Sequence, residues 1–247
     1  MITTIHNHQF DLSNPLDISI PFHSGFGQVN AFHAPPVRIT PVKEGDFVGS
    51  TKLGGVVNFM NFQCNPHGNG THTECVGHIS KETYNVNTCI EDTFYISELI
   101  SIFPNMTPNG DKVIERFHLE QFATLDKNID ALIIRTLSNE LEKQSRNYSG
   151  SNPVYLTPDA MEWIVEQGYK HLLVDMPSVD REEDGGALAC HKIFWNYPEL
   201  PQTQKSITEL IFVPNEIKDG IYLLKLNFMN LTMDAAPSKP TLYLKIK

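Results

Sequence analysis

The chain has 247 residues, 40% of them hydrophobic and 19% charged, which is typical of a globular protein and excludes a disordered or collagen-like one. It carries 19 Lys and Arg against 29 Asp and Glu, a net charge of −10, and its basic residues are spread singly along the chain. Nucleic acid is therefore not an expected partner, because phosphate backbones require a clustered cationic surface. No apolar stretch approaches the ~20 residues that cross a bilayer, and the start shows no secretory signal, so we expect a cytoplasmic protein without a membrane anchor.

No internal repeat, low-complexity tract or linker divides the chain, so a single domain spanning residues 1–247 is expected. Near the start, residues 10–22 predict extended segments that are broken at Asn14 and Pro15. Farther along, side chains alternate between two faces over residues 56–64, which predicts a largely buried strand followed by a polar loop.

A loop rich in Gly, His and Pro is predicted at residues 23–36. Aromatic side chains have little reason to occur in a loop that only links strands, whereas lids that exclude water and select a substrate often carry them. We expect this loop to be a substrate lid, with Phe26, Phe32 and His33 in the wall of the substrate pocket.

The rest of the chain alternates between helix and strand. Residues 118–124 suggest a short helix. Thr157 is a suitable N-cap, Pro158 fits the first helical position and Gly168 can end the helix. The predicted strands are residues 130–136, 171–176, 207–213, 220–227 and 241–246. This pattern predicts an α/β fold with a mixed β-sheet core and flanking helices.

The densest group of metal-capable side chains lies at residues 67–78, in the sequence HGNGTHTECVGH. His72 and Glu74 are two residues apart, so on an extended segment they point the same way and can bind one divalent ion. Two intervening glycines would let the backbone turn tightly enough for His67 to reach the same point. The alternative, from these residues alone, is a set of ordinary polar loop side chains.

This segment resembles the signature H-x-G-T-H-x-D-x-P-x-H of the cyclase-like metal-dependent hydrolases, a family that includes bacterial kynurenine formamidase. The G-T-H tripeptide ending at His72 matches, Glu74 stands at the position of the family's Asp, and His78 has the family's spacing. His67 lies one residue farther from His72 than the signature has it.

The resemblance covers most of the chain. Similar segments follow in the family's order at residues 132–136, 156–180, 189–195, 206–217 and 233–239. The resemblance implies a compact fold of the swivelling β/β/α type, often assembled as a homodimer, with one or two metal ions. The ligands it implies are His67, His72, Glu74, His191 and Glu209.

The resemblance also implies hydrolysis, with zinc as the expected metal, manganese as the alternative and His78 as the acid/base. Zinc in such a site lowers the pKa of bound water to about 7 and polarises a carbonyl. An imidazole with a pKa near 6.5 suits proton transfer to the leaving nitrogen. The expected substrate is a small molecule with an amide-type bond, foremost an aryl formamide such as N-formylkynurenine.

Two alternatives stay open: hydrolysis of a cyclic amide or lactone, and a catalytically silent relative that binds a small acidic or aromatic ligand. His78 favours an enzyme, because a structural metal requires no free histidine at that distance. The residues Asp175, Ser178 and Asp180 are interpreted as organising loops at a strand end. Arg135 is interpreted as an internally paired cation.

Overall fold

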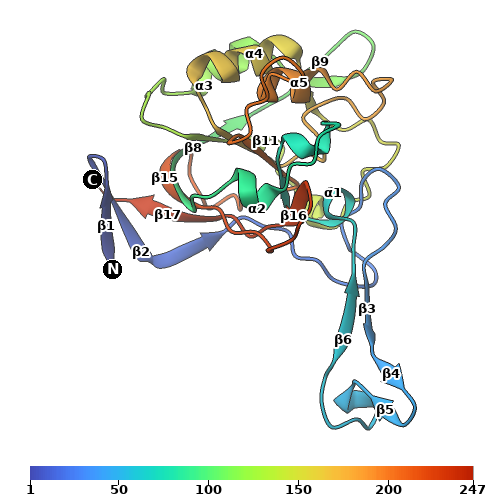
Figure 1. Ribbon diagram of the computed structural model, residues 1–247. Helices are drawn as coiled ribbons and strands as arrows, with labels where there is room; N and C mark the ends of the chain where they lie inside the picture. The colour runs from blue at the N-terminus through green and yellow to red at the C-terminus, as the bar shows by residue number, and fades with distance from the viewer. Residues whose placement is uncertain (247) are drawn as a thin grey trace.

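The computed structural model describes residues 1–246, and one ten-stranded β-sheet dominates it (Figure 1). The strands lie in the order β1-β2-β17-β15-β8-β11-β13-β14-β7-β16. Their bounds are β1 (Ile2–Ile5), β2 (His8–Asp17), β7 (His72–Glu74), β8 (Phe94–Ile102), β11 (Ala131–Thr136), β13 (His171–Val174), β14 (Ser206–Glu209), β15 (Gly220–Lys225), β16 (Ala235–Pro237) and β17 (Thr241–Lys245). Strands β8, β11, β13 and β14 are parallel to one another and the flanking strands pair antiparallel, so the sheet is mixed.

Strand β11 shows how the apolar runs of the sequence place the core. All of its residues are buried. Leu132 and Ile134 pack into one hydrophobic cluster, whereas Ile133 packs into a second, because successive side chains of a strand point to opposite faces. The predicted strand at residues 130–136 is confirmed, and it is covered on both faces.

Three helices cover one face of the sheet (Figure 1). They are α3 (Arg116–Phe122), α4 (Pro158–Gln167) and α5 (Ala189–Trp195). Helix α4 starts after Thr157 and stops before Gly168, whose φ of 88° is a conformation that glycine adopts without strain. The predicted ends of this helix are confirmed, although the Thr157 hydroxyl donates to the carbonyl of Ile114 and does not cap the helix.

Strand β2 differs from its prediction. It runs through Asn14 and Pro15 as one strand, where the sequence predicts a break. The irregularity appears in the pairing instead, because the register of β2 with β17 shifts between Leu242 and Leu244, opposite this stretch. Proline has no N–H to donate, so the shifted register accommodates it without ending the strand.

A narrow arm projects from the body of the molecule (Figure 1). Its elements are β3 (Arg38–Pro41), β4 (Lys43–Glu44), β5 (Phe47–Val48), the 3-10 helix η1 (Thr51–Leu53) and β6 (Met60–Gln63). Strand β6 pairs with β3. The prediction of a largely buried strand at residues 56–64 is wrong, because residues 56–63 are exposed and the strand begins at Met60. Alternating apolar side chains predict a strand with an apolar face, but the pattern does not show whether the rest of the same chain packs against that face.

Short elements connect these parts. They are α1 (Pro66–Asn69), η2 (Val76–His78), α2 (Val86–Cys89), β9 (Asn105–Met106), β10 (Lys112–Ile114), η3 (Leu141–Gln144) and β12 (Tyr155–Leu156). The protein is a compact mixed α/β domain with one large sheet and few helices, which confirms the predicted fold class. Within the described residues, every helix is too short or too polar to cross a bilayer.

Candidate metal centre

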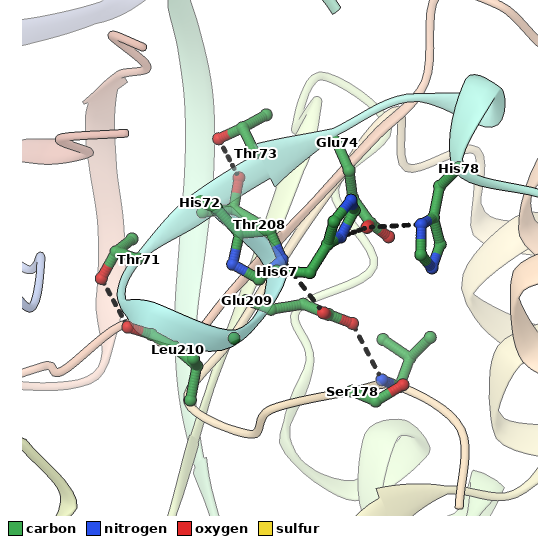
Figure 2. Close-up of polar contacts among 12 residues, drawn as sticks. His67, Thr71, His72, Thr73, Glu74, His78, Ser178, Thr208, Glu209 and Leu210 are labelled. Carbon is green, nitrogen blue, oxygen red and sulfur yellow. Dashed lines mark hydrogen bonds and ion pairs between the residues drawn. The ribbon is translucent and has the colours of Figure 1, made fainter. Parts of the chain in front are cut away.

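Strand β7 brings two predicted ligands to one point near the edge of the sheet. His72 and Glu74 are separated by one residue and therefore lie on the same face of the strand (Figure 2). Strand β14 pairs antiparallel with β7 and places Glu209 opposite His72. The Nε2 atom of His72 lies 3.4 Å from Oε2 of Glu209, and all three side chains are buried.

His67 reaches this group from the single-turn helix α1. Asn65 caps the helix, with its side-chain oxygen accepting a hydrogen bond from the N–H of Gly68. Gly68 packs so closely on the preceding loop that an added Cβ would lie 2.3 Å from the Cβ of Ala34. The tight turn absorbs the extra residue before β7 and leaves Nδ1 of His67 3.0 Å from Oε2 of Glu74.

His78 and His191 complete the group. His78 lies in the turn η2 after β7, with Nδ1 3.8 Å from Oε2 of Glu74 and its ring stacked on that of His67 (Figure 2). His191 projects from α5, and its Nε2 lies 3.2 Å from Oε1 of Glu74 and 3.9 Å from Oε1 of Glu209. The structure therefore brings together every residue that the sequence assigns to metal binding and acid/base catalysis.

The three predicted histidine ligands share one arrangement: one ring nitrogen contacts a fixed oxygen, and the other faces the group. Nε2 of His67 lies 2.9 Å from Oδ2 of Asp234. Nδ1 of His72 lies 3.0 Å from the carbonyl oxygen of Gly70, and Nδ1 of His191 lies 2.5 Å from Oδ2 of Asp180. Metal-binding histidines are oriented in this way, because the outer contact sets both the ring position and the tautomer.

Asp180 and Asp234 are members of the site that sequence reasoning missed. Asp180 also accepts hydrogen bonds from two backbone N–H groups at the start of α5, so it organises a loop as predicted and positions His191 as well. Asp234 directly precedes β16, the strand that pairs with β7, and its Oδ2 lies 3.6 Å from Nδ1 of His78. The signal that could have found Asp234 is the similarity of residues 233–239 to the family pattern.

Two other charged residues from the sequence analysis are structural. The guanidinium of Arg135 contacts Asp219 at 3.0 Å and donates to backbone carbonyls, which confirms an internally paired cation. Asp175 accepts hydrogen bonds from Lys143 and Thr136, so it ties the ends of neighbouring strands together.

The donor set fits a divalent ion. Two ligands about 2.1 Å from one tetrahedral ion lie roughly 3.4 Å apart, which matches the separations of 3.0 to 3.9 Å within the group. Nε2 of His72 and Oε2 of Glu74 are buried without a hydrogen-bond partner in residues 1–246. Burying a polar atom without a partner costs free energy, and a bound cation would remove that cost. Nδ1 of His67 lies close to Oε2 of Glu74 but forms no hydrogen bond with it.

Glu74 belongs to two sets of donors, and within each set the donor atoms lie within 4.8 Å of one another. One set contains His72 and Glu209, and the other contains His67 and His78. A shared carboxylate is compatible with one ion or with two. His78 is thus placed both to transfer a proton and to bind an ion. The metal content and turnover of a His78 variant distinguish these two roles.

The carboxylates also set the charge of the histidines. Burial by itself would lower the pKa of His67, but Asp234 and Glu74 outweigh burial and raise it to about 10. Burial likewise opposes charge on His191, whereas Asp180 and Glu74 raise its pKa to about 10. Without a metal ion both side chains are imidazolium cations at neutral pH, so each must release a proton when a metal ion binds.

The group opens into a cavity of about 340 Å³, a volume typical of small-molecule sites. His67, His78 and His191 line it together with Phe32 from the loop at residues 23–36. This position agrees with a place for Phe32 in a substrate wall, and its role there stays a prediction.

Phe26 and His33, for which the sequence also predicts a place in the substrate wall, lie outside this cavity. Phe26 is fully exposed between Gly25 and Gly27, both at positive φ, where the chain makes an outward turn. His33 is exposed as well, and its backbone N–H donates to the hydroxyl of Ser149. The composition of the loop predicts an aromatic wall but not which aromatic side chain points inward.

These features define a class of protein: a mixed α/β domain whose sheet carries a buried histidine and carboxylate centre. The chain belongs to the Cyclase family, whose model matches residues 10–181. The match includes β7, His78 and Asp180, whereas His191 and Glu209 lie beyond it.

Two kynurenine formamidases are similar in sequence. Those of Bacillus thuringiensis and Bacillus cereus are each 27% identical over 145 residues, 59% of this chain. The chain spans 64% of the length of these relatives.

Solved structures share the fold over nearly the whole chain. A predicted metal-dependent hydrolase from Bacillus stearothermophilus has a TM-score of 0.64 at 14% identity, covering 93% of this chain and 98% of that one. Isatin hydrolase A from Ralstonia solanacearum has a TM-score of 0.66 at 14% identity, covering 94% and 92%. At such identities the likeness establishes the fold.

Proposed function

We propose that the protein is a metal-dependent hydrolase of an amide-type bond, with an aryl formamide as the first candidate substrate. The observation that carries this proposal is the orientation of His67, His72 and His191, each held by an oxygen on one side and facing Glu74 or Glu209 on the other. Membership of the Cyclase family and the similarity to kynurenine formamidases support the choice of a formamide.

The proposed ligands are His67, His72, Glu74, His191 and Glu209, with zinc as the first candidate metal and manganese as the second. When bound, such an ion supplies Lewis acidity toward a carbonyl oxygen and lowers the pKa of water. Asp180 and Asp234 fix two of the imidazoles, and the N–H of Val179 donates to Oε1 of Glu209. These contacts hold the donors in place before an ion binds, which reduces the cost of ordering them.

His78 is the proposed acid/base. Its side chain is 30% exposed, lines the cavity, and lies beside the carboxylates of Glu74 and Asp234. From this position the imidazole can accept a proton from water and deliver it to the nitrogen that leaves when the C–N bond breaks. Hydrolysis of a formamide then yields formate and an amine.

A cyclic amide or lactone is the second candidate substrate class. The fold shared with isatin hydrolases supports including it. Ring opening uses the same groups, since a C–N or C–O bond breaks and the leaving atom again takes a proton; the two fragments merely stay joined in one product.

The test combines metal analysis with a substrate panel. Purified protein is analysed for zinc and manganese and assayed on N-formylkynurenine, formanilide, isatin, an aryl ester and a lactone, before and after chelation. We expect bound metal and hydrolysis of at least one amide, lost on chelation and restored by the metal. Bound metal without turnover of any compound would contradict the proposal and favour a catalytically silent relative.

A further inference from the structure

A second cavity, of about 250 Å³, lies beside the ends of two parallel strands. It adjoins Thr136, the last residue of β11, and Asp175, which follows β13. The carboxyl ends of parallel strands meet at one edge of a sheet, where α/β proteins commonly bind ligands. This cavity shares no lining residue with the cavity of the metal centre.

The floor of this cavity is a buried and fully paired ion pair. Nζ of Lys143 lies 2.7 Å from Oδ2 of Asp175 and also donates to the carbonyl and hydroxyl of Thr136. Asp175 accepts two further hydrogen bonds from Thr136. The negative charge of Asp175 is therefore compensated, and it does not prevent an anion from binding above it.

Two cations of the cavity lack such compensation. In the described part of the chain Lys112 has neither an ion pair nor a side-chain hydrogen bond. The carboxylate nearest to Arg146 is that of Glu142, which is 3.8 Å away and 83% exposed. An exposed ion pair of this kind contributes little to stability. Lys112 and Arg146 are therefore both available to bind a ligand.

A neutral donor adds to these cations. Tyr148 is 5% exposed and lies beneath the guanidinium of Arg146, 5.6 Å from ring centroid to Cζ. Its hydroxyl has no hydrogen-bond partner among residues 1–246, although the side chain lines the cavity. Burial raises the pKa of Tyr148, so the hydroxyl keeps its proton and can donate it to an acceptor.

The remaining wall is mixed: Val154, Met176 and two prolines form its apolar part, and Ser151 and Asn152 add polar groups. An apolar cavity of about 150 Å³ admits a benzene ring, so a cavity of about 250 Å³ has room for a ring with a charged substituent. We propose that this cavity is a binding site for a small carboxylate with a planar apolar body. Arg146 and Lys112 bind the carboxylate, and the hydroxyl of Tyr148 donates to it.

The test is calorimetric titration of the purified protein with benzoate, benzamide as its neutral counterpart, and inorganic phosphate. We expect benzoate to bind with a dissociation constant of about 1 mM or below, and benzamide and phosphate at least about tenfold more weakly. Arg146→Gln and Lys112→Gln should each weaken benzoate binding about tenfold or more, and Tyr148→Phe several-fold. Unchanged circular dichroism and unfolding midpoint verify that each variant is folded.

Two control variants locate the ligand. Lys52→Gln removes a cation from the distant arm and should leave benzoate binding unchanged. Phe32→Ala alters the cavity of the metal centre and should also leave it unchanged. The proposal is overturned if benzoate does not bind up to about 20 mM, if Arg146→Gln and Lys112→Gln bind it as wild type does, or if Phe32→Ala alone abolishes binding. Equal affinity for phosphate would overturn the apolar part of the site.

Discussion

Among single residues, Glu74 links three histidines of the metal centre, because its two oxygens face His67, His78 and His191. Burial opposes ionisation of this carboxyl, yet His78, together with His191 and His67, keeps its pKa well below the usual range. The carboxylate is therefore ionised and available to a cation at neutral pH. Its longer reach than aspartate fits the shifted position of His67 in α1.

Substitutions of His72 and of His78, which flank Glu74 in the sequence, should have different effects on metal content and activity. We expect His78→Ala to keep its metal and fold but to lose roughly 10²- to 10⁴-fold in kcat, the usual value of a positioned acid/base. His72→Ala should lose metal and activity together, because a ligand is removed. Elemental analysis and steady-state kinetics of both variants measure the difference.

Equal metal loss in the two variants would place His78 among the ligands. Undiminished turnover of His78→Ala would remove its acid/base role. Phe26→Ala serves as the control, since this exposed side chain does not line the cavity of the metal centre and its loss should change neither metal content nor rate.

Metal binding should tighten as pH rises. His67 and His191 have raised pKa values of about 10 in the metal-free protein, so each carries a proton at pH 7 that an ion must displace. Lowering the proton concentration favours the ion, and the logarithm of the association constant should rise by up to about two for each pH unit below pH 9.

Calorimetry in buffers of different ionisation enthalpy counts the protons released. About two protons are expected at pH 7 for wild type. Asp180→Asn removes the main group that raises the pKa of His191, so this variant should release fewer. Binding that is independent of pH between about 6 and 9 would contradict the expected displacement.

At the scale of elements, the loop at residues 23–36 offers a matched pair of aromatic residues. Phe32 lines the cavity of the metal centre, whereas Phe26 is fully exposed. Phe32→Ala should weaken binding of an aromatic substrate by about 1–2 kcal/mol, which corresponds to a five- to thirtyfold rise in KM with a smaller change in kcat.

Phe26→Ala should retain the wild-type KM. Steady-state kinetics on the best substrate of the panel compare the two variants, and metal analysis verifies that the centre is intact in each. Similar KM values for Phe32→Ala and wild type would exclude Phe32 from the substrate wall.

Elements that obey a local rule could be predicted from the sequence alone. Helix α4 begins at Pro158 and stops before Gly168 because backbone preference fixes both positions. Strand β11 follows from an uninterrupted apolar run. The burial of residues 56–64 could not be predicted, because burial depends on what packs against a strand.

For the whole molecule, the arm carries a group of exposed apolar side chains. The most exposed of them are between 39% and 88% exposed and comprise Phe47, Leu53, Val56, Val57, Phe59, Met60 and Phe62. A two-stranded arm has little independent stability in water, and such a surface marks an interface. We propose that a second copy of the chain covers the arm in a homodimer, because a twofold interface uses the same surface on both subunits and closes on itself.

Two charges on the arm should dissociate this dimer. The double variant Leu53→Asp/Val56→Asp alters side chains that are 60% and 88% exposed, so the fold should be retained while the interface is lost. Light scattering after size-exclusion chromatography should give a dimer for wild type and a monomer for the variant.

The matched control is Phe103→Asp/Leu141→Asp, which alters side chains of similar exposure on the body of the protein and should remain dimeric. A wild-type protein that is monomeric at micromolar concentration would contradict the proposal, and so would an arm variant that stays dimeric.

The amino-acid sequence is enough to predict the alternation of strands and helices and to place His72, Glu74 and His78 in one short segment. Residues close in the chain stay close in space, so their spacing is sufficient to predict a shared face. That Asp180 and Asp234 orient two of the histidines is seen only in the folded chain. Their contacts join distant segments, and such contacts depend on strand order and packing, which no local pattern encodes.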